Sequence, residues 1–172
     1  MLKDSKFIAG ETGFMTNVSP ATVNIENCEF SGNHQAAFLR GGTYTIKNSS
    51  FTLKAELEST HSENNHMKQW QDGIRAAFAG ITIGNYLSSA YQYPTTVAMT
   101  GVTVKVEGTH ASSFPAVHVC ANAADNKGVV LTYDNSCSFT STYDPAVEYG
   151  TANITVNGEK VEKSNVKQET SN

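Results

Sequence analysis

A short motif that recurs five times constrains the fold of this chain more than any other feature. Each copy has two apolar residues two positions apart, then Asn or Gly two positions on, and another apolar residue three or four positions later. The copies are Val23-Asn-Ile25-Glu-Asn27 with Phe30, Tyr44-Thr-Ile46-Lys-Asn48 with Phe51, Val97-Ala-Met99-Thr-Gly101 with Val104, Leu131-Thr-Tyr133-Asp-Asn135 with Phe139, and Ile154-Thr-Val156-Asn-Gly158 with Val161. Because residues two apart share one face of a strand, the motif predicts five strands with one buried face.

The Asn or Gly position of the motif predicts a sharp corner after each strand. Asn and Gly are the residues that adopt positive φ most readily, so their exchange at one position indicates left-handed backbone there. The later apolar residue then resumes the inward face on a second strand. The predicted corner residues are Asn27, Asn48, Gly101, Asn135 and Gly158.

The spacing of the copies predicts stacked coils with insertions. The copies begin at residues 23, 44, 97, 131 and 154, so the intervals are 21, 53, 34 and 23 residues. Intervals in the low twenties, lengthened by insertions at a fixed corner, are typical of a solenoid. One small-and-apolar segment in each interval predicts a third strand per coil: Ala36-Ala37-Phe38, Ala76-Ala77-Phe78, Ala116-Val117-His118-Val119 and Ala146-Val147-Glu148.

The corner segments IENCEF, IKNSSF and YDNSCSF resemble the Asn-containing corner of the right-handed parallel β-helix, or pectin-lyase-like, family. The resemblance covers residues 20 to 161 and implies an all-β solenoid of about five coils, with corner Asn side chains stacked as a ladder. The alternative is a β-sandwich, which also has strands at regular intervals separated by turns.

The remaining segments are interpreted around this β-helix domain, 20–161. Insertions are predicted at 54–75, 84–96 and 105–115, where polar sequence separates the expected strands. Residues 1–19 are predicted to be an incomplete first coil or a cap, and 162–172 a disordered tail because they are almost free of apolar residues. The lack of an obvious N-terminal cap favours a longer parent protein.

Composition excludes several classes of protein. Ser, Thr and Asn make up 50 of the 172 residues, whereas charged residues make up 16% and only six residues are Leu, which argues against helical bundles and coiled coils. The net charge of −4 provides no basic stripe for nucleic acid. We find no run of 18 apolar residues for a membrane span and no signal peptide in the N-terminal segment.

The resemblance raises the question of catalysis, because polysaccharide lyases and hydrolases share this fold. Such a lyase needs carboxylates for calcium and a base that removes the proton next to a uronate carboxylate. The weak candidates here are Asp72, Arg75, Asp144 and Glu148. The hydrolase strings Asn-Thr-Asp, His-Gly and Arg-Ile-Lys are absent from the sequence, so structural or solvated roles are favoured for all four residues.

Aromatic residues in the insertions favour sugar binding over catalysis. Trp70, Tyr86, Tyr91 and Tyr93 lie in polar segments outside the alternating strands, where exposed rings could stack on the C–H faces of sugars. The alternative is that these rings fold back and are buried against the coil wall.

Histidine and cysteine give no indication of a metal or cofactor. Cys28, Cys120 and Cys137 form no CxxC and have no His at zinc spacing, so they are interpreted as buried apolar side chains. The alternative for this odd count is one disulfide plus a free thiol. His110 and His118 are interpreted as solvated, because neither has a Cys or carboxylate partner at metal spacing.

These observations favour a non-catalytic β-helix module of a secreted, cell-surface or phage-type fibre protein. It would act as a structural stalk or as an adhesin that contacts a polysaccharide or surface glycan. The alternative is a polysaccharide lyase or glycoside hydrolase, or a degenerate remnant of one, that acts on an acidic polysaccharide. Both hypotheses place the protein outside the cell or at its surface.

Overall fold

Three sheets dominate the computed structural model, which describes residues 1–16, 20–56, 67–69, 75–84, 93–120, 128–150 and 153–164. Sheet A contains β1 (Leu2–Lys3), β4 (Thr22–Glu26), β7 (Gly42–Lys47), β12 (Thr95–Thr100), β15 (Val129–Tyr133), β18 (Ile154–Val156) and β19 (Glu159–Val161), in that order. Sheet B runs β2 (Lys6–Ile8), β5 (Glu29–Gly32), β8 (Ser50–Lys54), β13 (Thr103–Glu107) and β16 (Ser138–Thr140). Sheet C runs β3 (Thr12–Met15), β6 (Gln35–Leu39), β11 (Ala79–Gly84), β14 (Val117–Cys120) and β17 (Val147–Tyr149).

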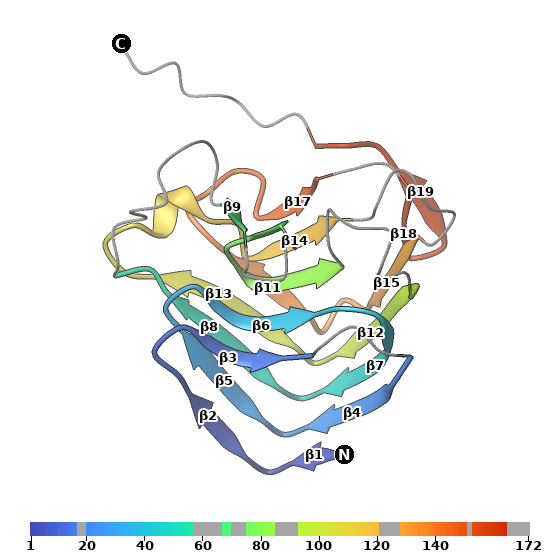
Figure 1. Ribbon diagram of the computed structural model, residues 1–172, viewed down its shortest axis with the longest axis horizontal. Helices are drawn as coiled ribbons and strands as arrows, with labels where there is room; N and C mark the ends of the chain where they lie inside the picture. The colour runs from blue at the N-terminus through green and yellow to red at the C-terminus, as the bar shows by residue number, and fades with distance from the viewer. Residues whose placement is uncertain are drawn as a thin grey trace.

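Each pass of the chain adds one strand to sheet A, then one to sheet B, then one to sheet C (Figure 1). Strands of successive passes pair in parallel, and the antiparallel pairs in the described residues are β18 with β19 and β9 (Met67–Gln69) with β10 (Arg75–Ala77). The all-β class predicted from the sequence is confirmed. A β-sandwich consists of antiparallel sheets, so that alternative does not describe this arrangement.

The core lies between the three sheets and consists of rows of equivalent residues from successive passes. The alternation of the motif explains the rows, because residues two apart in each strand point inward together. In sheet B the register aligns Phe7, Phe30, Phe51, Val104 and Phe139. The rings of Phe7 and Phe30, and those of Phe30 and Phe51, stack with centroids 4.9 Å apart in both pairs.

Left-handed residues form the corner between sheet A and sheet B in four successive passes. They are Asp4, Asn27, Asn48 and Gly101, with φ of 48°, 53°, 47° and 63°. Gly101 is required by space as well as by φ, because a Cβ there would lie 2.6 Å from Oδ1 of Asn48. The corners predicted at Asn27, Asn48 and Gly101 therefore have the expected backbone, and Asp4 is a corner that the sequence analysis missed.

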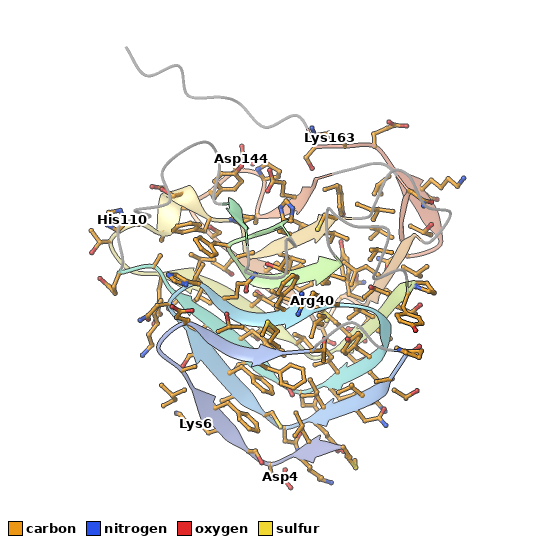
Figure 2. The ribbon with its side chains drawn as sticks, viewed as in Figure 1. Asp4, Lys6, Arg40, His110, Asp144 and Lys163 are labelled. Carbon is orange, nitrogen blue, oxygen red and sulfur yellow. The ribbon has the colours of Figure 1, made fainter. Side chains whose placement is uncertain are left out.

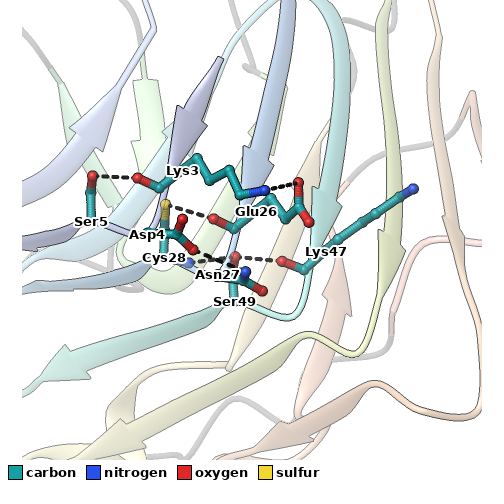
Figure 3. A network of polar contacts seen from close by, with 8 residues as sticks. All are labelled: Lys3, Asp4, Ser5, Glu26, Asn27, Cys28, Lys47 and Ser49. Carbon is teal, nitrogen blue, oxygen red and sulfur yellow. Dashed lines mark hydrogen bonds and ion pairs between the residues drawn. The ribbon is translucent and has the colours of Figure 1, made fainter.

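A polar network connects the corners of neighbouring passes (Figure 3). The amide of Asn27 donates through Nδ2 to Oδ1 of Asp4 at 3.0 Å, so this side-chain contact between corners joins Asn to Asp and not Asn to Asn as predicted. The backbone N–H of Asn27 donates to the carbonyl of Lys47 in the next pass at 3.1 Å. After three of the corners the next side chain donates back to the preceding strand: Ser5 to the carbonyl of Lys3, Cys28 to that of Glu26, and Ser49 to that of Lys47. The Ser49 hydroxyl also accepts from the N–H of Cys28.

The predicted corners at Asn135 and Gly158 differ from the expected one-residue bend. Asn135 does not have positive φ, and the connection between β15 and β16 spans four residues. The Asp134 side chain accepts a hydrogen bond from the N–H of Ser136 at 3.0 Å, and such an Asx-turn replaces the left-handed bend. Asn157 and Gly158 both have positive φ, at 50° and 90°, and form the tight turn of the antiparallel β18–β19 hairpin.

Substitution of the corner asparagines tests this difference. Asn48→Ala is expected to lower the free energy of unfolding by about 1 kcal/mol, because alanine has no local hydrogen bond to offset the left-handed conformation. Asn48→Gly should change it by only a few tenths. Asn135→Ala is the matched control, and its effect should stay within about 0.5 kcal/mol. Equal losses of unfolding free energy for the two alanine variants in urea titrations would contradict the assignment of left-handed backbone to Asn48 and not to Asn135.

One of the four predicted third strands is misplaced. Ala36–Phe38, Val117–Val119 and Val147–Glu148 lie in β6, β14 and β17 of sheet C, as expected. Ala76 and Ala77 instead belong to β10, and the sheet C strand of that pass is β11, which begins at Ala79. Ala36-Ala37-Phe38 and Ala76-Ala77-Phe78 are similar, but an insertion precedes β11. Alignment of the two segments therefore places this strand a few residues too early.

Some of the predicted segments overlap strands of the structure, and others lie mostly outside the described residues. Residues 2–15 form β1 to β3, and the insertion predicted at 105–115 starts inside β13 and contains the short 3-10 helix η1 (Ala111–Ser113). Most of 54–75 and 84–96, and residues 165–172 of the predicted tail, lie outside the described residues. In the described part of the chain, no helix has the length and apolar character needed to cross a membrane.

Candidate functional site on the outer face of sheet C

Buried polar side chains gather on one side of the molecule. The described part of the chain has seven buried polar or charged residues, and five of them lie in sheet C or directly after one of its strands. These five are Gln35, Arg40, Thr82, His118 and Glu148. Because burial of a polar group is costly unless it is satisfied, this concentration makes sheet C the place to look for a site.

Strand alternation places the central pair of this cluster on the outer face of the sheet. In β14, Val117 and Val119 belong to the hydrophobic core, so His118 between them points to the opposite face. The register sets His118 beside Thr82 of β11 on one side and beside Glu148 of β17 on the other. His118 and Glu148 are only 1% and 4% exposed.

His118, Glu148 and Tyr143 form a hydrogen-bonded cluster. Nδ1 of His118 lies 2.6 Å from Oε2 of Glu148. A carboxylate can only accept, so with Glu148 ionised the proton of this bond sits on Nδ1. The Tyr143 hydroxyl donates to the other carboxylate oxygen of Glu148 at 3.3 Å.

The electrostatics of the neighbouring groups follow from burial and from the Glu148 charge. Burial raises the pKa of the Tyr143 hydroxyl, and the nearby Glu148 carboxylate raises it further. Burial likewise raises the pKa of the Cys120 thiol, and the charge of Glu148 adds to the effect. Cys120 therefore stays a neutral thiol, which is the wrong state for a nucleophile.

Two further buried polar side chains of sheet C, Gln35 and Arg40, also have hydrogen-bond partners. Gln35 donates through Nε2 to the Thr82 hydroxyl at 2.9 Å. Arg40 donates through Nε to the carbonyl of Thr16 at 3.0 Å, and its guanidinium carbon lies 4.8 Å from the centroid of the Phe38 ring. Hydrogen bonds and a cation–π contact thus compensate the burial of this charge.

The arrangement has the parts of an acid–base centre. A carboxylate that holds Nδ1–H of an imidazole fixes the ring and its tautomer, as in many hydrolytic sites. General base catalysis also requires that the imidazole reach the substrate. With both side chains nearly fully buried, the geometry of His118 and Glu148 suits a structural pair that fixes β14 to β17.

A second polar feature is an open recess along the corners between sheets A and B. Its volume is about 390 Å³. It is lined by Asn27, Cys28, Glu29, Asn48, Ser49, Ser50, Gly101 and Thr103. Amide and hydroxyl groups of this kind can hydrogen-bond the hydroxyls of a sugar.

Of the four residues predicted for catalysis, the structure describes the side chains of Asp144 and Glu148, and these differ in exposure. Asp144 is exposed on the segment between β16 and β17, whereas Glu148 is buried in β17. Asp72 lies outside the described residues. Arg75 begins β10, and its side chain is not among those described.

One of the four aromatic candidates for glycan contact can be placed. Tyr93 precedes β12 and is 46% exposed, as expected for a ring that meets a ligand. Trp70, Tyr86 and Tyr91 lie outside the described residues. Their predicted exposure stays a prediction.

The interpretation of His118 as a solvated residue is wrong. The sequence did contain a signal for its pairing with Glu148, because the two segments Ala116-Val117-His118 and Ala146-Val147-Glu148 align position by position. In a parallel sheet such an alignment sets His118 beside Glu148, which is the observed register. Among the described residues, no group of three or more His, Cys, Asp or Glu is arranged to hold a metal ion.

The three cysteines are free and differ in burial. Cys28 and Cys120 are buried as predicted, whereas Cys137 is partly exposed, so its interpretation as a buried side chain is wrong. In native protein at neutral pH, a chromogenic disulfide reagent should therefore titrate one thiol quickly, and denaturant should release the other two. Cys137→Ser should abolish the fast phase and leave the slow two. Fast reaction of Cys120 would contradict its assignment as a buried neutral thiol.

Comparison of the sequence with protein-family models, with curated proteins and with solved structures finds no match in any of the three.

Proposed function

We propose that this chain is a right-handed parallel β-helix module of a secreted, cell-surface or phage-type fibre protein, and that it acts without catalysis. In this role it serves as a rigid stalk that presents a glycan-contacting surface. The observation that carries the proposal is the repeated addition of one strand to each of three parallel sheets over five successive passes. A stack of this kind gives a continuous core and a stiff element that can be lengthened pass by pass.

Two features of the surface support contact with a glycan. The exposed ring of Tyr93 can pack on the C–H face of a sugar. The recess along the corners offers the amides of Asn27 and Asn48 and the hydroxyls of Ser50 and Thr103 to sugar hydroxyls. The Glu29 carboxylate in the same lining can accept hydrogen bonds from sugar hydroxyls and would repel an anionic ligand, so the recess favours neutral sugar hydroxyls over an anion.

A glycan array followed by titration of the best ligand tests the binding proposal. Tyr93→Ala should cost about 1 kcal/mol, which corresponds to roughly a fivefold rise in Kd. Ile8→Ala removes another exposed apolar side chain, in β2 of sheet B, and should leave Kd unchanged. The absence of any bound glycan, or equal effects of the two substitutions, would overturn the glycan part of the proposal.

The His118–Glu148–Tyr143 cluster favours a second candidate, an enzyme or enzyme remnant that acts on an acidic polysaccharide. The first proposal predicts no new reducing ends and no unsaturated products when the protein is incubated with uronate polymers. Products that disappear in both Glu148→Gln and Arg75→Ala, with the fold retained by circular dichroism, would establish the enzyme and overturn the non-catalytic module.

A further inference from the structure

The hairpin at the edge of sheet A turns on the single Asn-Gly pair of the sequence. Asn157 and Gly158 join β18 to β19, and both residues are exposed. A Cβ on Gly158 would meet no heavy atom within 4 Å, so the turn projects into open space. Figure 1 shows this hairpin at the end of the sheet, and Figure 2 shows Lys163, two residues after β19, at the opposite end of the molecule from Asp4. The pair is therefore open to water and to base.

An asparagine that is followed by glycine can react with its own backbone. The backbone nitrogen of the next residue, after loss of its proton to base, attacks Cγ of the asparagine, and a new N–Cγ bond forms as ammonia leaves. Glycine favours this step because it has no Cβ to hinder the approach of the two atoms. Among the described residues, the N–H of Gly158 donates no backbone hydrogen bond, so none has to break before its proton is lost.

From these features we infer that Asn157 is a site of spontaneous covalent modification, which converts it to aspartate and isoaspartate through a succinimide ring. Water opens the ring at either of its two carbonyls. One opening gives aspartate, and the other gives isoaspartate, in which the main chain runs through the former side-chain carbon. The overall reaction consumes one water and releases one ammonia, and it requires no enzyme, oxidant or cofactor. The inference goes beyond the proposed function and does not depend on glycan contact.

Asn153, just before the other end of β18, provides a matched comparison within the same chain. It is also exposed and left-handed, with φ of 65° against 50° for Asn157. The residue that follows it is Ile154, which is buried and β-branched, so its side chain hinders the attack on Asn153. A difference in reactivity between the two asparagines therefore comes from the following residue, and not from exposure or from the sign of φ.

The two products differ in their effect on the hairpin. The N–H of Tyr133 donates to Oδ1 of Asn157 at 2.8 Å, and the N–H of Asn157 donates to the carbonyl of Leu131 at 2.9 Å. Aspartate keeps an acceptor for the first of these bonds. Isoaspartate adds one carbon to the main chain of a two-residue turn, whose tight geometry is what pairs Val156 with Glu159. Isoaspartate should therefore open the β18–β19 hairpin.

Peptide mapping by mass spectrometry of the 172-residue chain, aged in mildly alkaline buffer, tests the site. Asn157 should lose its amide roughly tenfold faster than Asn153, because glycine has no Cβ and isoleucine has a branched one. An isoaspartate-specific methyltransferase should label the peptide that contains Asn157. Asn157→Gly, which keeps a Gly-Gly turn, should abolish both signals. Equal rates at the two asparagines, or amide loss at Asn157 only after the chain is unfolded in urea, would overturn the inference.

Nuclear Overhauser effects across the hairpin test the structural consequence. The isoaspartate form, separated from the aged protein by ion exchange, should lose the backbone contacts between Thr155 and Lys160, which pair in the unmodified chain. Freshly prepared Asn157→Asp is the control, because it carries the same added charge on a normal main chain, and it should keep these contacts. An isoaspartate form that retains the contacts, or an equal loss in Asn157→Asp, would overturn the assigned effect of the extended main chain.

Discussion

Phe30→Ala is expected to lower the free energy of unfolding by about 3–5 kcal/mol, a large share of the 5–15 kcal/mol that stabilises a typical domain. Phe30 is 2% exposed and lies in the middle of the aromatic row of sheet B. The centroid of its ring lies 4.9 Å from those of Phe7 and Phe51 and 5.6 Å from that of Phe14. Alanine would leave a cavity between two passes that the rigid backbone stack cannot close.

Phe139→Ala is the matched control for this prediction. Phe139 occupies the equivalent position of β16, but it is only partly buried and contacts Tyr133 edge-on at 5.0 Å. Its loss should cost clearly less than that of Phe30 in the same urea titrations. A cost below about 1 kcal/mol for Phe30→Ala would show that the aromatic row is not part of the core.

His118→Leu is expected to destabilise the fold by about 3–5 kcal/mol, because it leaves the Glu148 carboxylate buried without its imidazole partner. Glu148→Leu should cost less, since a histidine can remain buried as the neutral ring. The double variant should be more stable than the sum of the single effects predicts, with a coupling of about 1–3 kcal/mol.

This cycle also separates the two candidate functions. If the pair is structural, the two substitutions should show this coupling free energy, and the double variant should still bind the glycan. If instead each single substitution costs less than about 1 kcal/mol and the effects add, the pair is solvated in solution. That result would contradict the buried geometry and favour the accessible acid–base centre of the enzyme hypothesis.

The strands of sheets A and B could largely be predicted from the sequence, for a physical reason. Alternating apolar residues before Asn27, Asn48 and Gly101 are visible locally, and left-handed φ is confined to few residue types. Asp4 was missed because the first pass lacks the first apolar residue of the motif. The later part of the motif is present there, because Leu2-Lys-Asp4 followed by Phe7 matches Ile25-Glu-Asn27 followed by Phe30. This shorter match would have identified Asp4.

Where the motif misled, a second local interaction competed with it. Asn135 has the predicted residue type, but the Asp134 side chain caps the turn one residue earlier through Ser136. A hydrogen bond from the Ser136 hydroxyl lowers the pKa of Asp134 most, and the one from the Ser136 N–H lowers it further. At Gly158 the preceding Asn157 completes an Asn-Gly pair, which is the strongest short signal for a hairpin.

The candidate site was harder to predict because it depends on register between distant segments. His118 and Glu148 are 30 residues apart in the sequence and lie on different strands. Their contact follows only when β14 and β17 are known to be neighbours in parallel. Local sequence supports a solvated histidine just as well, and that interpretation proved wrong.

The parallel order of the passes is the central claim, and nuclear Overhauser effects between backbone protons test it most directly. The register predicts contacts of Val97 with Tyr44 on one side and with Leu131 on the other, residues that are 53 and 34 positions apart. Equivalent contacts should join Val104 to Phe51 and to Phe139 in sheet B. Antiparallel contacts between consecutive strands such as β4 and β5, in place of these, would contradict the account.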